Sequence, residues 1–234
     1  MKVEVLFPEF CNLYGDLANI LYLRKCIPEA IFIETNFEQE PAFVTQEVNL
    51  IYLGPMTEKM QERTIEKLRR YKKQIQQQIE KGTVFLLTGN SFEILGKEIQ
   101  NEDGSKIEAL GILDIYAKRD MMHRFNDMIL GTLEEKNVPI VGFKNQFTQC
   151  YGKNEQNYFI KTRKGSGINK DSILEGIRIH NLIGTYLLGP ICILNPLFTK
   201  YLLKLMGIKE PKLAFEEEMM KAYEKRLEEF EKVL

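Results

Sequence analysis

Several residue types that often carry chemistry are scarce or absent in this chain. Its 234 residues include no tryptophan, two histidines and four cysteines. A Cys–His or Ser–His mechanism would therefore have to use His123 or His180. Neither histidine has distinctive neighbours in the sequence, and we expect both to be solvated or structural.

The cysteines show no paired spacing. Cys11, Cys26, Cys150 and Cys192 are scattered, and no CxxC occurs. This pattern is typical of reduced thiols and argues against a disulfide framework or a zinc site. It predicts a cytoplasmic protein that holds no metal.

Other signals are missing as well. No apolar stretch approaches the roughly 20 residues that cross a bilayer, and the N-terminal apolar run, which Pro8 interrupts, is too short for a signal peptide. The sequence contains no HExxH, no Walker A motif and no GxGxxG after a strand, so we expect no cofactor. The net charge of −1 argues against nucleic acid or an anionic membrane as the main partner.

What the sequence does contain is an alternation of apolar runs and helical patterns. Short apolar runs predict buried strands at 3–7, 30–34, 50–53, 83–87 and 139–143. Such alternation is typical of an open parallel sheet with helices on its faces. The clearest helix is predicted over residues 57–81, with an apolar stripe from Ile65 to Ile79 and a stop at Gly82.

The C-terminal half has a different character. Residues 157–162 and 173–179 alternate or run apolar, and we interpret them as antiparallel additions to the sheet. The chain ends in a predicted amphipathic helix, which we expect to dock on the protein's own core. With no repeat and no low-complexity linker, residues 1–234 are predicted to form one α/β domain.

Five longer motifs follow one another along the chain. They are NLYGDLANI (12–20), TGNSFEILG (88–96), GFKNQ (142–146) and GSGINKDSILEGI (165–177) leading into GTYLLGPICILNP (184–196). In this order the chain resembles the CobB/CobQ-like glutamine amidotransferase domains of the cobyric-acid-synthase type. Within them it is most similar to the glutaminase subunits of lipid II isoglutaminyl synthase.

The resemblance implies a fold, a reaction and a partner. The fold would be flavodoxin-like, an open and mostly parallel sheet with helices on both faces and a nucleophile on a strand-to-helix elbow. Members hydrolyse glutamine through a cysteine thiolate, a histidine and an oxyanion site. The ammonia passes to a synthetase, which in the most similar relatives is a Mur-ligase-like subunit of cell-wall synthesis.

The reactive residues do not carry over. The family's elbow, Cys-Gly-Gly-Tyr-Gln-Leu-Leu-Gly, aligns on residues 89–96, so Gly89 stands at the nucleophile position. The family's Thr-Tyr-Leu-His-Gly-Pro places Leu188 at the histidine position, and in GFKNQ, Lys144 and Gln146 replace glutamate and histidine. We therefore predict an elbow that keeps its shape without its nucleophile, in a protein that is catalytically inactive.

The remaining alignment suggests a substrate site. Its candidate residues are Gly54, Asn90, Arg124, Gln146 and Tyr186.

Two alternatives stay open. One is a glutaminase that uses displaced residues such as Cys192 or Cys150, although we expect these to be buried structural thiols. The other is a sensor that binds glutamine or a related amide without cleaving it. Beside the elbow, Ser91 is expected to be a helix N-cap, because a hydroxyl needs a nearby base to be a useful nucleophile.

Overall fold

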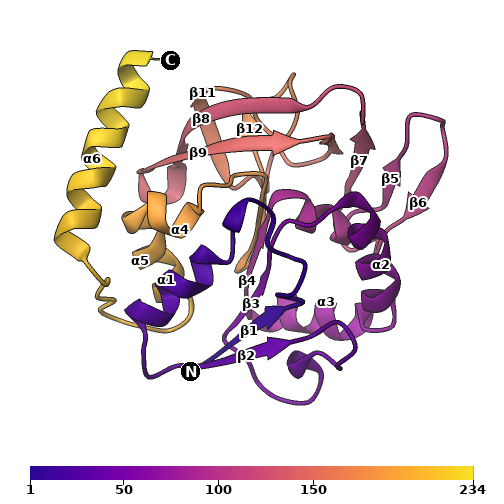
Figure 1. The fold of residues 1–234 in the computed structure, drawn as a ribbon, viewed down its shortest axis with the longest axis horizontal. Helices are drawn as coiled ribbons and strands as arrows, with labels where there is room; N and C mark the ends of the chain where they lie inside the picture. The colour runs from indigo at the N-terminus through magenta and orange to yellow at the C-terminus, as the bar shows by residue number, and fades with distance from the viewer. Residues whose placement is uncertain (234) are drawn as a thin grey trace.

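A six-stranded sheet forms the centre of the computed structural model, which describes residues 1–233 (Figure 1). Its strand order is β13-β14-β4-β3-β1-β2, and every neighbouring pair is parallel except β13 and β14. The strands are β1 (Lys2–Leu6), β2 (Ile31–Thr35), β3 (Leu50–Leu53), β4 (Val84–Thr88), β13 (Ile177–Ile179) and β14 (Leu182–Thr185). The first four predicted strands are confirmed in position to within one residue at each end, but the predicted burial is wrong for β2, which lies at the edge of the sheet with Ile31 exposed.

Helices cover both faces of this sheet, as predicted. Side chains alternate across a strand, so Ile51 and Leu53 join one apolar cluster while Leu50 and Tyr52 join the other. The first cluster packs against α2 (Glu58–Arg69) and α3 (Lys72–Lys81). The second packs against α1 (Ala18–Cys26) and α5 (Pro196–Leu205), which follows the short α4 (Ile191–Leu194).

The single helix predicted over 57–81 is wrong, because the chain turns at Arg70 and Tyr71 between α2 and α3. A straight helix of that length would extend about 37 Å, whereas a five-residue strand spans only about 17 Å. The break keeps both halves against the sheet and buries Tyr71 edge-on against Phe43. Gly82 ends α3, as predicted, and its backbone lies in the left-handed region.

Two four-stranded sheets extend the molecule beyond the parallel core. One has the order β10-β7-β5-β6 and the other β12-β11-β8-β9. Their strands are β5 (Glu98–Gln100), β6 (Lys106–Glu108), β7 (Ile115–Arg119), β8 (Phe125–Leu133), β9 (Val138–Gln146), β10 (Thr148–Gly152), β11 (Ile160–Lys164) and β12 (Leu174–Glu175).

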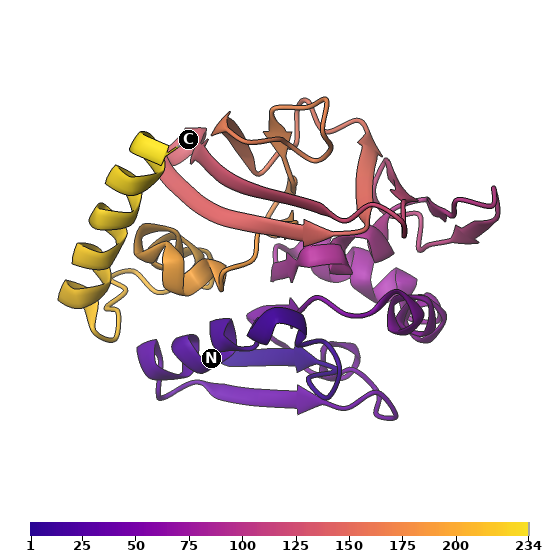
Figure 2. The same ribbon diagram turned by 45° about the horizontal axis from the view of Figure 1, so that its top comes forward.

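The strand predicted at 139–143 belongs to β9 and is not part of the parallel sheet. Only the short segment around η4 (Glu134–Lys136) separates it from β8, so the two strands form an antiparallel hairpin that arches over the core (Figure 2). The predicted antiparallel additions are likewise only partly right. Of the segments 157–162 and 173–179, β13 alone joins the main sheet, and β11 and β12 pair with each other.

The C-terminal helix α6 (Glu216–Val233) docks on the protein's own core, as predicted. Its Tyr223 is buried and donates a hydrogen bond from its hydroxyl to the Pro139 carbonyl over 2.7 Å. Arg226 donates to the Leu194 carbonyl over 2.8 Å. The helix thereby packs beside α4, α5 and β9 at one side of the molecule (Figures 1 and 2).

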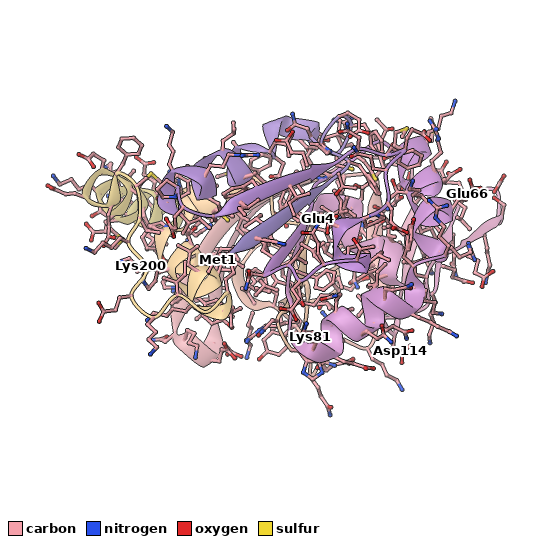
Figure 3. All side chains as sticks on the ribbon, turned by 90° about the horizontal axis from the view of Figure 1, so that it is seen from below. Met1, Glu4, Glu66, Lys81, Asp114 and Lys200 are labelled. Atoms are coloured by element: carbon pink, nitrogen blue, oxygen red, sulfur yellow. The ribbon has the colours of Figure 1, made fainter. Side chains whose placement is uncertain are left out.

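A buried acid on β1 holds the loop between β2 and β3 in place. Glu4, labelled in Figure 3, accepts hydrogen bonds from the backbone N–H of Ala42 and of Phe43 and from the Thr35 hydroxyl. These bonds hold the short helix η2 (Ala42–Val44) in place. None of the helices within residues 1–233 is long and apolar enough to cross a membrane.

Candidate functional site

A cavity of about 340 Å³ opens at the carboxyl ends of β3, β4 and β14. Ligand sites of open α/β sheets lie at this end of the strands. Five segments that are distant in sequence line it, with Arg124 at the rim: 13–14, 55–58, 89–90, 145–148, and the turn that carries Tyr186 and Leu188.

The elbow after β4 keeps the backbone shape of a nucleophile turn. Gly89 directly follows the strand with φ +59°, and η3 (Gly89–Leu95), a 3-10 helix, begins there. An exposed and strained turn residue is typical of such elbows. A Cβ built on Gly89 would lie 3.5 Å from Leu188 Cδ2. The structure therefore places side by side the two positions that the motif alignment assigns to the family's cysteine and histidine.

Pro55 restricts the space at the nucleophile position. A Cβ on Gly89 would lie 2.6 Å from the Cβ of Pro55, closer than side-chain carbons approach. The Pro55 carbonyl accepts a hydrogen bond from the backbone N–H of Leu13 over 3.1 Å, which helps to hold Pro55 in place. A cysteine at position 89 would thus require the loop after β3 to shift. The sequence signal for this contact is the Gly54–Pro55 pair directly after β3.

Asn90 lines the cavity, but its side chain is engaged with the neighbouring loop. Its Oδ1 accepts from the Met56 N–H over 3.1 Å, and its Nδ2 donates to the Met56 carbonyl over 2.8 Å. Gly54, also a candidate, is absent from the lining residues. A Cβ there would lie 2.4 Å from the Cys11 carbonyl oxygen, so glycine is needed for backbone approach.

Gln146 and Tyr186 form part of the buried wall. Gln146 Nε2 donates to the Thr148 carbonyl over 2.6 Å, which leaves Oε1 buried without a partner among residues 1–233. The Tyr186 hydroxyl donates to Glu93 Oε1 over 2.7 Å and lies 3.1 Å from Cys150 Sγ. The Tyr186 hydroxyl is therefore bound into the protein interior, whereas Gln146 keeps a buried acceptor oxygen that is free of hydrogen bonds within residues 1–233.

Arg124 lies at the exposed rim of the cavity. Its guanidinium lies 4.5 Å from the centre of the Phe147 ring and donates to Asn145 Oδ1 over 3.1 Å. The Tyr14 hydroxyl donates to the same oxygen over 2.9 Å. Of the five candidates, Asn90, Arg124, Gln146 and Tyr186 thus meet at one cavity.

The thiols proposed as substitutes are enclosed. Cys150 and Cys192 are fully buried, and neither is among the residues that line the cavity. Burial raises the pKa of both thiols, which disfavours the thiolate that a nucleophile requires.

Neither histidine can act as a base at the elbow, and Ser91 has none beside it. His123 and His180 are exposed and lie outside the cavity. Ser91 is not an N-cap: Thr88 precedes η3, and the Ser91 hydroxyl lies 2.8 Å from both the Leu53 and Thr88 carbonyl oxygens. A hydroxyl held by two carbonyls in this way has no base to take its proton.

Sequence reasoning did not find the buried ionic groups beneath the site. Lys144 and Glu175 form a fully buried ion pair with 2.6 Å between Nζ and Oε2. Glu175 Oε1 also accepts from the Thr185 hydroxyl and the Tyr186 N–H, each over 2.9 Å. The pair therefore supports the turn that carries Leu188. Lys144 was recognised as a departure from the family motif, but its partner, 31 residues further along the chain, left no local signal.

Glu93 on the elbow is a second buried acid. It accepts from Gln61 Nε2 and the Tyr186 hydroxyl, each over 2.7 Å, and from the Thr148 hydroxyl. Burial raises the pKa of this carboxyl. Residues 1–233 contain no group of three or more His, Cys, Asp or Glu side chains arranged to hold a metal ion.

Comparison with known proteins identifies the class. The CobB/CobQ-like glutamine amidotransferase domain matches residues 2–192, and the chain belongs to this family. Two crystal structures of glutamine amidotransferases share the fold. One has a TM-score of 0.57 at 13% identity and covers 88% of this chain and 100% of its own. The other, from Thermotoga maritima, has a TM-score of 0.55 at 12% identity and covers 99% and 86%.

Within the family, the chain is similar to subunits of one enzyme. The GatD subunit of the glutamine-hydrolysing lipid II isoglutaminyl synthase of Staphylococcus aureus is 30% identical over 197 residues, 82% of this chain and 79% of the relative. The corresponding GatD subunit of Streptococcus pneumoniae is 25% identical over 194 residues, 82% of this chain and 74% of the relative. The resemblance seen in the sequence motifs is thereby confirmed.

Proposed function

We propose that this chain is a glutaminase-like subunit that does not hydrolyse glutamine and that acts as a binding partner of a Mur-ligase-like synthetase. The observation that carries the proposal is the juxtaposition of Gly89 and Leu188 at the cavity. Hydrolysis of an amide by the family mechanism needs a thiolate that attacks and an imidazole that transfers the proton. Glycine and leucine supply neither.

The local surroundings support this proposal. Pro55 fills space that a nucleophile's Cβ would need, so the loop after β3 is adapted to glycine at position 89. The two buried thiols have raised pKa values and no contact with the cavity. Glutamate release through Cys150 or Cys192 is therefore the less favoured candidate function.

The expectation of a synthetase partner rests on the relatives, whose names describe them as subunits of lipid II isoglutaminyl synthase. Pull-down from the native host tests it directly. Recovery of a Mur-ligase-like protein is expected, and recovery of none, with the bait folded, would contradict the partner role.

The experiment that tests the missing chemistry measures glutamate release from glutamine, with and without the recovered synthetase. Four proteins are compared: the wild type, Gly89→Cys with Leu188→His, the same pair with Pro55→Gly, and a Cys150→Ala, Cys192→Ala variant. We expect an inert wild type and the highest rate from the triple variant, because it restores both reactive groups and the space for one of them.

Glutamate release by the wild type would overturn the proposal, and loss of that release in the double alanine variant would assign the activity to a thiol. A triple variant that stays inert although it is folded would leave the proposal standing and show that the cavity no longer presents glutamine to position 89.

A further inference from the structure

The cavity is open to solvent at its rim and closed at its floor. At the rim, Tyr14 is 47% exposed. At the floor, Met56 and Tyr186 are fully buried, and Leu188 is only 1% exposed although it lines the cavity. A molecule that enters from solvent therefore meets the rim first, and it reaches the floor beside Gly89 only when a group at the rim moves.

One hydrogen bond crosses the mouth of the cavity from side to side. Tyr14 follows β1, whereas Asn145 lies on β9, whose Phe143 pairs with Leu188 after β14. In the sheet, β3 and β4 separate β1 from β14, so the two sides are about 14 Å apart at a strand spacing of about 4.8 Å. The Tyr14 hydroxyl nevertheless donates to Asn145 Oδ1 over 2.9 Å and lies 3.2 Å from the Asn145 carbonyl oxygen. The tyrosine side chain and β9 together thus span the ends of β3 and β4, where the elbow lies.

The backbone of Tyr14 is strained while its side chain crosses the mouth. Its φ is +61°, in the left-handed region that a residue with a side chain adopts at a cost. The hydrogen bond to Asn145 is exposed, so on opening the hydroxyl exchanges it for a bond to water, and its net contribution is of the same order as the strain. Two opposing contributions of similar size keep the open position accessible as a minor state.

We propose that Tyr14 is a latch that closes the cavity and whose release admits small molecules to the floor. In the closed position Asn145 holds its hydroxyl, and in the open position the side chain turns to solvent. The neighbouring Leu13 stays in place, because its N–H donates to the Pro55 carbonyl over 3.1 Å and ties the turn to the loop after β3. Access to Gly89 is therefore controlled at the rim. This control does not depend on whether the chain cleaves glutamine.

A reporter thiol on the floor measures how often the latch opens. Leu188→Cys introduces it in a Cys26→Ala background, because Cys26 is half-buried while the other native thiols are fully buried. Iodoacetamide is the probe, and the mass of the intact protein records its addition. Met56→Cys supplies a second reporter at another fully buried position on the floor. Glu66→Cys, on the exposed face of α2, gives the rate of a free thiol. We expect the floor thiols to react about tenfold more slowly or less, since only the minor state admits the probe.

Variants of the latch should raise this rate. Tyr14→Phe should speed the labelling of either floor thiol about three- to tenfold, because it removes the hydroxyl and its bond but keeps the ring. Asn145→Ala should act in the same direction and less strongly, because the Asn145 carbonyl oxygen remains. The two changes together should give no more than Tyr14→Phe alone, because both act on the same bond.

Two controls separate the latch from general loosening. Tyr158→Phe makes the same change at a tyrosine that also donates to a side chain, that of Glu134, but lies outside the cavity, and it should leave the rate unchanged. The fully buried Cys150 should stay unlabelled in every variant, which shows that the protein remains folded. Three results would overturn the latch: floor thiols that react as fast as the exposed one, labelling that Tyr14→Phe leaves unchanged, or effects of Tyr14→Phe and Asn145→Ala that add.

Discussion

Pro55 and Gly89 are in such close contact that a Cβ on Gly89 would lie 2.6 Å from the Cβ of Pro55. Gly89 also has φ +59°, which a residue with a side chain adopts at a cost. We therefore expect Gly89→Ala to destabilise the protein by about 2–4 kcal/mol, through backbone strain and overpacking together. Urea unfolding measures this change.

A second glycine separates the two contributions. Gly104 has φ +83°, yet nothing lies within 4 Å of a Cβ built there. Gly104→Ala should therefore cost only the backbone part, about 1–2 kcal/mol. Pro55→Gly should reduce the cost of Gly89→Ala and leave that of Gly104→Ala unchanged. Equal costs at the two glycines would show that Pro55 moves aside freely.

The buried ion pair of Lys144 and Glu175 leads to another prediction. Removing one partner of a buried pair leaves an uncompensated charge, so Lys144→Met should destabilise by about 3–5 kcal/mol. Adding Glu175→Gln should recover much of this loss, because glutamine keeps an oxygen for the Thr185 hydroxyl and the Tyr186 N–H.

An exposed pair with the same separation serves as the control. Lys221 and Glu217 on α6 are also 2.6 Å apart, but their side chains are 70% and 75% exposed. Lys221→Met should cost less than about 1 kcal/mol. If denaturant unfolding gives Lys144→Met and Lys221→Met similar values, burial does not control the strength of the inner pair.

The parts of the fold that were predictable are those with local signals. Each strand of the parallel sheet up to β4 is a short apolar run. The elbow after β4 was predictable because Gly89 comes directly after such a run. The break between α2 and α3 has no glycine or proline to mark it. It arises because two helices must fit the short strands beneath them.

The candidate site was predictable to the extent that family motifs cover it. These motifs predicted Gly89 and Leu188 at one site, and in the structure both residues line the same cavity, with 3.5 Å between Leu188 Cδ2 and a Cβ built on Gly89. The contact of Pro55 with Gly89 and the partner of Lys144 depend on segments that only the folded chain brings together. Long-range packing of this kind leaves no periodicity in the sequence.

The buried acid Glu93 makes stability depend on pH. Burial raises the pKa of this carboxyl above its ordinary value of 4.5, so the folded state holds the proton more tightly than the unfolded state does. The free energy of unfolding should therefore fall as pH rises from 4.5 through the raised pKa. Urea unfolding at pH 5 and at pH 7.5 measures the difference between the two conditions.

Glu93→Gln isolates the contribution of this residue, because glutamine does not titrate. The variant should lose less stability than the wild type between pH 5 and pH 7.5, whatever its stability at either pH. A residual decrease should remain, because burial also raises the pKa values of Asp16 and Glu4. Glu66→Gln, at an exposed position, should keep the full wild-type dependence. If Glu93→Gln keeps it too, the carboxyl of Glu93 titrates alike in the folded and unfolded states, and its hydrogen bonds from Gln61, Thr148 and Tyr186 offset the cost of burial.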